Sequence, residues 1–328
     1  MAATTITDYT VVAKLIEGYI AANFTHKSSL IQSGIIGTIP EANLSYGNSW
    51  QVRGDIQYTT DWQTPTAATD LTVRAISHFS EVGIILRRAD IFGFEDAARI
   101  AAGDTNALAR VGGHIKNHVM TQIERTYLEH LVPGMFLSGG PFEGSTYSVS
   151  TGAPFDTGGS DVASARKLHG ANGSELSILL MHPTVYYNAE INRVATNLDY
   201  AAIQAFNERG MMYGGMFNGA VIILNDQVYN DGTLYHSYLT RPGALALGYQ
   251  KAFGIEADRD IKLAAGTSQV KYDMYFSPHF IGASYTGTIP TVIGGGTDAE
   301  LLAGSNFTAR TSISASEVGM VAIITTEA

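Results

Sequence analysis

Cysteine is absent from the 328 residues of this chain. The protein therefore has no disulfide, no thiolate ligand for zinc and no cysteine nucleophile, which fits a chain that folds in a reducing cytoplasm. It also lacks any run of about eighteen apolar residues, the length that a membrane-spanning helix needs. The polar stretch from Met1 to Asp8 has no basic region of the kind that opens a signal peptide. We therefore expect no membrane span and no secretion signal.

Charge is scarce as well. Asp, Glu, Lys and Arg together make up 15 % of the chain, against about 25 % in an average soluble protein. Their balance gives a formal net charge of -10, whereas a protein that grips nucleic acid through its phosphates needs basic residues. Enclosing DNA requires no attraction to it, and an acidic lining would let packed phosphates slide. We therefore expect no specific DNA binding.

What the chain does have is apolar residues and glycine. Hydrophobic residues make up 45 %, enough for a folded core, and 328 residues can form two ordinary domains. Glycine stands at 35 residues, about a tenth of the chain, where roughly 7 % is usual. A monomer that must stay soluble rarely combines so few charges with so much glycine. The composition is typical of a protein whose surface is largely covered by copies of itself.

The clearest local signal is a helix expected over residues 104–132. Its apolar residues recur at steps of three or four: Leu108, Val111, Ile115, Val119, Ile123, Tyr127 and Leu131. Asp104 or Thr105 is expected to cap it, and Pro133-Gly134 to end it. At 1.5 Å per residue the helix spans about 40 Å, which suits a backbone for other layers. A shorter helix is expected before it, from Phe94 to Ala102.

Upstream of this helix the pattern indicates an arm and a hairpin. Residues 1–46 contain one amphipathic stretch, with Val11, Val12, Leu15, Ile16, Tyr19 and Ile20 at helical spacing. The rest of 1–46 is polar, so we predict an arm with one short helix that is stable only against another surface. Ser49–Thr60 and Asp70–Ser80 are rich in β-branched and aromatic residues and flank a polar loop. They predict a long hairpin without a core of its own.

Downstream of the helix the pattern indicates a compact α/β unit. Residues 138–175 are rich in glycine and serine and are expected to be loop. A buried strand at Leu176–Met181 then leads into a helix from Pro183 to Val194. The remaining expected strands are Ala220–Leu224, Thr233–Leu239, Ala244–Tyr249, Lys271–Tyr285 and Glu317–Thr326. The second and third of these are expected to form a hairpin around Arg241-Pro242-Gly243.

Residues that could carry chemistry form no convincing site. His114 and His118 lie one helical turn apart, a spacing that can hold zinc, but Ile115 stands where a metalloprotease has glutamate. The carboxylates of Asp258, Asp260, Asp298 and Glu300 are expected to be solvated or locally ion-paired. Residues 294–296 are three glycines without the Lys-Ser/Thr of a phosphate loop. We predict no catalytic residue, no metal site and no cofactor.

The order of the elements and seven short motifs resemble a known family. The motifs lie at residues 83–91, 181–186, 219–226, 243–248, 256–260, 277–282 and 297–308. In this order they are similar to segments of the Hong Kong-97-type major capsid protein of tailed bacteriophages. The resemblance is clearest from about residue 83 to 285, and residues 1–46 contribute little to it.

The resemblance implies an α+β fold, the Hong Kong-97-type capsid fold. Its parts would be an N-terminal arm (1–46), an extended β-hairpin loop (47–92), a peripheral domain (93–140 and 251–328) with the spine helix 104–132, and an α/β axial domain (141–250). The implied function is structural and not enzymatic. Hexamers and pentamers would form an icosahedral virion head, assembled in the host cytoplasm, that encloses double-stranded DNA.

The resemblance also suggests partners. A scaffolding protein is expected as a separate chain, together with a portal and decoration proteins. Some members of the family crosslink the loop to a neighbour through lysine and asparagine, but residues 54–80 contain no lysine. Our candidates for contacts between subunits are Trp62, Pro65, Arg87, Arg88, Arg241 and Arg259.

Three other functions stay open from the sequence. A nanocompartment shell shares the capsid fold but encloses enzymes, and particle diameter and nucleic-acid content would separate it from a virion head. A hydrolase that uses carboxylates would act as a soluble monomer. A tail or decoration component would form tubes or trimers.

Overall fold

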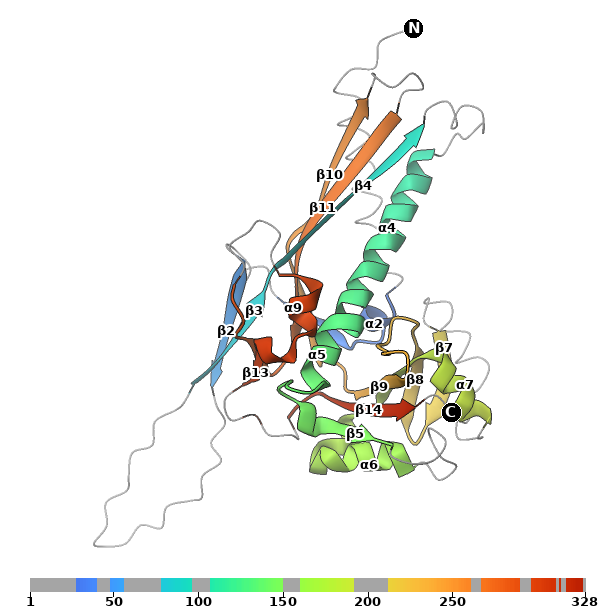
Figure 1. Cartoon of the computed structure of the whole chain (residues 1–328), viewed down its shortest axis with the longest axis vertical. Helices are drawn as coiled ribbons and strands as arrows, with labels where there is room; N and C mark the ends of the chain where they lie inside the picture. Colours follow the sequence, from blue (N-terminus) through green and yellow to red (C-terminus); the bar gives the residue numbers. More distant parts are fainter. Residues whose placement is uncertain are drawn as a thin grey trace, which may run out of the picture.

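The computed structural model describes residues 28–39, 48–55, 78–95, 107–149, 160–191, 212–260, 267–289, 296–310, 313 and 317–326. These residues form a molecule that is narrow at one end and broad at the other (Figure 1). A four-stranded sheet and a long helix make up the narrow end, and a six-stranded sheet with short helices makes up the broad end. A two-stranded hairpin lies at the side. The predicted α+β class is confirmed.

Three long strands form the narrow end: β4 (Leu86–Glu95), β10 (Leu245–Asp260) and β11 (Thr267–Phe280). β11 lies between the other two and is antiparallel to both, and the short β1 (Ile36–Thr38) runs parallel to β10. Alternate side chains of a strand point to opposite faces of the sheet. The face of β11 toward the long helix is therefore apolar and buried, with Val270, Tyr272, Met274 and Phe276.

The long helix covers this face. It begins as α4 (Ala107–Arg125), continues as a π-helical turn (Thr126–Leu131) and ends as α5 (Val132–Phe136) (Figure 1). Where the side chains are described, the predicted stripe is confirmed, because Ile115, Val119, Ile123, Tyr127 and Leu131 are all buried. The side chains of Leu108 and Val111 and both predicted caps lie outside the described residues.

The predicted stop at Pro133-Gly134 is wrong, because the helix runs on to Phe136. A proline inside a helix normally breaks it, since it has no N–H for the bond to the residue four positions earlier. Here the turn before Pro133 has already changed register, and the Val132 N–H donates to the Tyr127 carbonyl, five residues back. Pro133 thus lies in the first turn of a new α-helical segment, where proline is tolerated.

The broad end is built on the six-stranded sheet. Its strands, in spatial order, are β5 (Thr146–Ser148), β14 (Met320–Thr326), β9 (Leu234–Thr240), β6 (Ile178–Met181), β8 (Ala220–Leu224) and β7 (Met212–Phe217). β6 and β8 are parallel, and the chain between them contains α7 (Pro183–Ile191), which starts at the predicted Pro183, and then β7, which is antiparallel to β8. The expected strand–helix–strand unit is therefore confirmed, while the predicted helix end at Val194 lies outside the described residues.

The predicted hairpin of β9 and β10 is wrong. β9 pairs with β14 and β6, whereas β10 pairs with β1 and β11 of the other sheet. The turn at 241–243 therefore carries the chain from one sheet to the other, and Gly243 has the positive φ, 73°, that this change of direction requires. β14 also lies in the six-stranded sheet, apart from the rest of 251–328. The division into arm, loop, peripheral and axial domains stays a prediction.

Three segments differ from the sequence prediction, because tertiary contacts override weak local patterns. The expected loop 138–175 contains β5 and α6 (Ser160–Leu168), which buries Val162 and Ala165. Phe94 and Glu95 belong to β4 and not to a helix. In the predicted arm, β1 and α2 (Ser29–Gln32) form part of the body, with Leu30 fully buried. The predicted helix at 11–20 lies outside the described residues.

The predicted hairpin at the side of the molecule is present. β2 (Ser49–Asp55) is antiparallel to β3 (His78–Ile84), and β3 runs into β4 with only Ile85 between them. Residues 56–77 lie outside the described residues. A small sheet of β12 (Ala283–Tyr285) and β13 (Phe307–Ala309) lies next to β3 (Figure 1). The short helix α9 (Asp298–Leu302) packs against the π-helical turn and α5.

His236 on β9 makes the stability of the broad end depend on pH. Its ring is buried and neither ring nitrogen has a hydrogen-bond partner. Burial lowers its pKa from 6.5 to about 4, and the nearby Asp231 opposes this only in part. Between these values the unfolded chain binds a proton that the folded chain does not, so stability falls as the pH drops from 6.5 toward 4.

We expect His236→Phe to remove this acid sensitivity. At pH 5 the wild type should lose about 2 kcal/mol of unfolding free energy relative to pH 7 through His236 alone, as a shift of one pKa unit is about 1.4 kcal/mol. Over the same pH change, the variant should lose about 2 kcal/mol less unfolding free energy than the wild type. Urea unfolding of the dissociated protein at both pH values measures the difference, and equal pH slopes in the two proteins would contradict the assignment.

Candidate functional site

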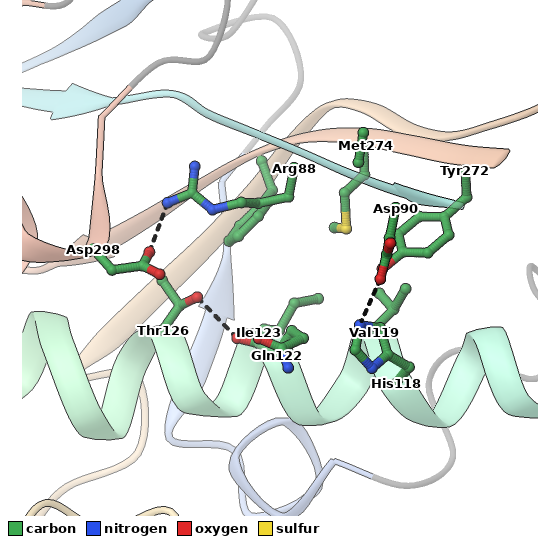
Figure 2. Close-up of a pocket in the computed structure, with 12 residues that line it drawn as sticks. Arg88, Asp90, His118, Val119, Gln122, Ile123, Thr126, Tyr272, Met274 and Asp298 are labelled. Atoms are coloured by element: carbon green, nitrogen blue, oxygen red, sulfur yellow. Dashed lines mark hydrogen bonds and ion pairs between the residues drawn. The ribbon is translucent and has the colours of Figure 1, made fainter. Parts of the chain in front are cut away.

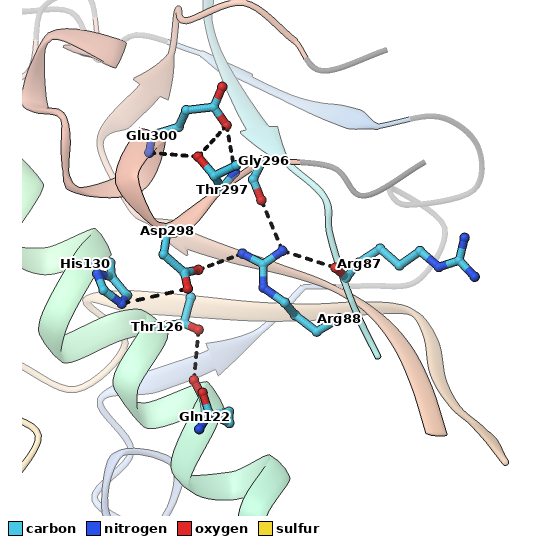
Figure 3. A network of polar contacts seen from close by, with 9 residues as sticks. All are labelled: Arg87, Arg88, Gln122, Thr126, His130, Gly296, Thr297, Asp298 and Glu300. Atoms are coloured by element: carbon cyan, nitrogen blue, oxygen red, sulfur yellow. Dashed lines mark hydrogen bonds and ion pairs between the residues drawn. The ribbon is translucent and has the colours of Figure 1, made fainter. Parts of the chain in front are cut away.

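Segments that are far apart in the sequence meet at polar junctions, of which one lies under the long helix and another at the base of the hairpin. At the first, Arg88 of β4 donates to Asp298 Oδ1 at 2.6 Å and to the Gly296 carbonyl at 3.1 Å (Figure 3). Asp298 opens α9, whose start is fixed by reciprocal hydrogen bonds between Thr297 and Glu300. Arg88 therefore joins the long sheet to α9.

The same aspartate faces the long helix. Asp298 Oδ2 lies 3.9 Å from His130 Nε2 on the π-helical turn (Figure 3). Burial lowers the pKa of His130, so that at neutral pH the ring is uncharged and the contact is weak. Arg88 and Asp298 are both partly exposed, and ion pairs of this kind contribute at most about 1 kcal/mol. The junction therefore fixes geometry more than it adds stability.

A cavity of about 330 Å³ lies beside this junction, between α4 and the long sheet (Figure 2). Apolar side chains such as Val119, Ile123 and Met274 line its middle. Arg88 and Asp298 stand at one end, and Asp90 and His118, 3.5 Å apart, stand at the other. Each carboxylate is thus paired with a basic group at its own end.

A metal site and a membrane-spanning helix each set a requirement on the described part of the chain. There, no group of three or more His, Asp or Glu side chains lies close enough together to hold a metal ion. His114 and His118 do not converge on such a group. Within the same residues, no helix is long and apolar enough to cross a membrane.

The second junction holds the base of the hairpin. Glu81 of β3 is only 5 % exposed, and its carboxylate lies 3.0 Å from His279 Nε2 on β11 and 3.3 Å from Arg310 just after β13. The Arg310 guanidinium also lies 4.2 Å from the centre of the Phe79 ring. We call Glu81, His279 and Arg310 the hairpin clasp. It ties one hairpin strand to two separate parts of the body.

Trp50 fixes the other strand of the hairpin. Its buried indole packs edge-on against His279, with ring centres 4.9 Å apart, and its Nε1 donates to Ser277 Oγ. The indole also lies against the backbone of Gly83 on the paired strand, where any Cβ would collide with it at 2.3 Å. The base of the hairpin is therefore packed onto the long sheet, which agrees with the prediction that the hairpin leans on another surface.

Glu81→Gln is expected to lower the free energy of unfolding by about 2 kcal/mol, because it removes the charge that faces His279 and Arg310 in a buried place. Glu256→Gln, on strand β10 of the long sheet, is the matched control. Glu256 pairs with Lys271 at 3.0 Å but is 74 % exposed, so its loss should cost less than about 1 kcal/mol. Urea unfolding of the two variants tests this, and equal effects would show that the clasp adds nothing beyond a surface ion pair.

Three of the six predicted contact residues have described side chains, and all three are paired within the chain. Arg87 lies 3.7 Å from Asp273 and over the ring of Tyr275. Arg88 forms the first junction, and Arg241 contacts Glu175 at 2.8 Å. Each of these arginine side chains is about 30 % exposed, so each still presents atoms to a neighbour. Their role between subunits stays a prediction.

The structure does not bring the three described residues of this set into one site. Arg87 and Arg88 lie on the long sheet, whereas Arg241 lies in the turn between the two sheets. Trp62, Pro65 and the side chain of Arg259 lie outside the described residues. The hairpin clasp was missed by the sequence analysis, because Glu81 is 198 residues from His279 and 229 from Arg310. Its one local signal is a carboxylate in the middle of a strand.

Solved structures of phage capsids share this arrangement. The capsid of Ralstonia phage GP4 matches with a TM-score of 0.58 at 12 % identity, over 92 % of this chain and 92 % of that chain. A structure from Mycobacterium phage Cain matches with a TM-score of 0.54 at 12 % identity, over 94 % of this chain and 97 % of that chain. The capsid asymmetric unit of Cyanophage Pam1 matches with a TM-score of 0.52 at 9 % identity, over 90 % of this chain and 89 % of that chain. The chain has the Hong Kong-97-type capsid fold.

The predicted spine helix 104–132 overlaps the α4–α5 rod, and the predicted extended loop contains β2 and β3. Their roles as spine helix and extended loop stay predictions. The predicted fold is thus confirmed by matches that each cover at least 90 % of this chain at 9 to 12 % identity. No protein-family model matches the sequence, and no curated protein sequence does. The fold is therefore recognised through its arrangement in space.

Proposed function

We propose that this chain is the major capsid protein of a tailed phage. Copies of it would form hexamers and pentamers that close into an icosahedral head around double-stranded DNA, in the virion and, during assembly, in the host cytoplasm. The observation that carries the proposal is the match to a phage capsid over 92 % of both chains. A match of that extent leaves no large part of the chain for an unrelated function.

The physical properties of the chain support this role. A long helix on a long sheet makes a stiff rib, and the hairpin extends from its side (Figure 1). Ring-forming contacts join different patches on neighbouring copies, so weak contacts accumulate around a closed shell. A single contact of about -4 kcal/mol is only millimolar by itself. Low surface charge and a net charge of -10 suit copies that cover one another and surround DNA without binding it.

We also propose the partners that such a shell requires. A scaffolding protein would act as a separate chain, a portal would occupy one vertex, and decoration proteins would bind the outside. DNA would be enclosed without sequence-specific contacts, and no membrane would take part. The function would be structural, without catalysis and without a cofactor.

Expression of the chain alone and with candidate scaffolding proteins tests the proposal. Negative-stain images should show rings or closed shells. Shells that hold DNA when packaged support the virion head, whereas small shells that enclose a protein cargo would identify a nanocompartment of the same fold. Monodisperse monomers that turn over a substrate would overturn the proposal.

A further inference from the structure

One carboxylate joins three parts of the protein that are far apart in sequence. Glu124, near the end of α4, accepts hydrogen bonds at Oε1 from the Ser29 backbone N–H at 2.7 Å and from the hydroxyls of Ser28 and Ser29, both at 2.9 Å. At Oε2 it accepts from Asn225 Nδ2 at 3.1 Å. The same Asn225 amide also donates to Ser29 Oγ at 2.9 Å. We call these four residues the Glu124 joint.

The joint connects the two ends of the molecule. Glu124 belongs to the helix that covers the long sheet, whereas Asn225 directly follows β8 of the six-stranded sheet and its N–H donates to Met181 at the end of β6. Ser28 caps α2 through a side-chain bond to the Ile31 N–H, and α2 leads into β1 at the edge of the long sheet. The Glu124 side chain therefore links the long helix that carries it to the broad end, through Asn225, and to the α2 segment, through Ser28 and Ser29.

The three partners of Glu124 are buried and Glu124 itself is half-buried, which makes the geometry of the joint demanding. Ser28 and Ser29 are at most 6 % exposed and Asn225 is 9 % exposed. Buried polar groups are costly when they lose a partner, and hydrogen bonds weaken outside about 2.7–3.2 Å. A rotation of the six-stranded sheet relative to α4 would separate Asn225 from Glu124 and leave both without that bond. The joint therefore favours one angle between the two ends.

We propose that Glu124 is a positioning residue that sets the angle between the rib and the broad end, and with it the curvature of the shell. This inference rests on the proposed function, because curvature has meaning only for a chain that forms a shell. In a closed shell every copy carries the same change of angle, so the effects of a small change on curvature add up around the shell. Loss of the joint should therefore give shells of mixed size or open sheets, even when each copy is folded.

An exchange of donor and acceptor across the joint gives a sharp test. Glu124→Gln keeps one oxygen for the serines but turns an NH₂ group toward the Asn225 amide, so two donors face each other. Asn225→Asp alone places a second carboxylate about 3 Å from Glu124, where like charges repel. The double variant restores a donor and an acceptor, because the new amide can donate to the new carboxylate. We expect both single variants to fail and the double variant to recover.

Two readouts separate the angle from general stability. The first is the diameter distribution of particles in negative stain, where each single variant should give at least about tenfold fewer shells of wild-type size, as a hydrogen bond to a charged group contributes about that factor. The second is a distance between spin labels in the dissociated protein. Because the chain has no cysteine, Thr121→Cys on α4 and Lys167→Cys on α6 can be labelled without background. The wild type and double variant should give one narrow distance, and the single variants a broad one.

Glu129→Gln is the matched control, since Glu129 lies on the same rod and forms an exposed ion pair with Arg125. It should leave particle size and label distance unchanged. Wild-type particles and a narrow distance in both single variants would overturn the inference. If even the wild type forms no particles under any condition, the proposed function fails, and the label distances alone then decide whether Glu124 fixes the angle.

Discussion

A variant that lacks residues 60–69 is expected to fold as the wild type does and to form no closed shell. The deletion lies beyond the base of the hairpin, where the hairpin clasp and Trp50 hold β2 and β3 to the body. None of these contacts involves the deleted residues. The hairpin is proposed to pack on a neighbouring copy, so its loss removes one contact from every copy at once. Because a shell depends on many modest contacts together, assembly should be lost as a whole.

Circular dichroism and thermal unfolding measure whether the deleted protein is folded, and negative-stain images measure assembly. As a control, a Gly-Ser stretch of equal length in place of 60–69 keeps the length of the hairpin and removes Trp62 and Pro65. It should also fail to assemble if those two side chains make the contact. If the deletion unfolds the protein, the hairpin belongs to the core of its own copy and the layout proposed above is wrong.

A second large effect is expected from Gly304→Ala. Three backbone segments meet at this point, namely α5 at Gly134, the following turn at Gly140 and the short 3₁₀ turn Gly304–Asn306 after α9. A Cβ on Gly304 would lie 2.6 Å from the Gly134 carbonyl oxygen and 2.7 Å from the Gly140 Cα. Backbone atoms cannot rotate away as a side chain can. The segments must therefore separate, and we expect a loss of about 3 kcal/mol or more.

Gly144→Ala is the control for this substitution. Gly144 lies in the same region, its Cβ would meet no atom within 4 Å, and its φ is not positive. Its replacement should change the free energy of unfolding by less than about 0.5 kcal/mol. Urea unfolding of the dissociated variants measures both values. A Gly304→Ala protein as stable as the control would show that the turn Gly304–Asn306 is not packed backbone to backbone against α5 and Gly140.

Elements with a strong local pattern could be predicted from the sequence. The apolar spacing from Ile115 to Leu131 predicts the long helix, and the run Ala220–Leu224 predicts a buried strand whose bounds the structure confirms. Pro183 marks the start of its helix correctly. In each case the signal is either the spacing of apolar residues over a short stretch of chain or a proline, whose φ angle is fixed. Such signals do not depend on the rest of the fold.

Predictions failed where the outcome depended on a distant partner. Pro133 was expected to end the long helix, but a π-helical turn packed against α9 changes the register before it. β9 and β10 are separated by an ordinary turn sequence, yet each finds stronger partners in a different sheet. Residues 28–39 were expected to be part of an irregular arm, but Glu124 and β10 supply the partners that order them.

The sequence by itself determined the absence of cysteine chemistry, the low charge, the long amphipathic helix and an order of elements that resembles one capsid family. All of these are local or compositional properties. Only the tertiary structure decided which strands share a sheet, how the hairpin is held and which groups meet Glu81 and Glu124. The physical reason is that periodicity acts over a few residues, whereas these hydrogen bonds join groups 95 to 229 positions apart. Their partners are chosen by the packing of the whole chain.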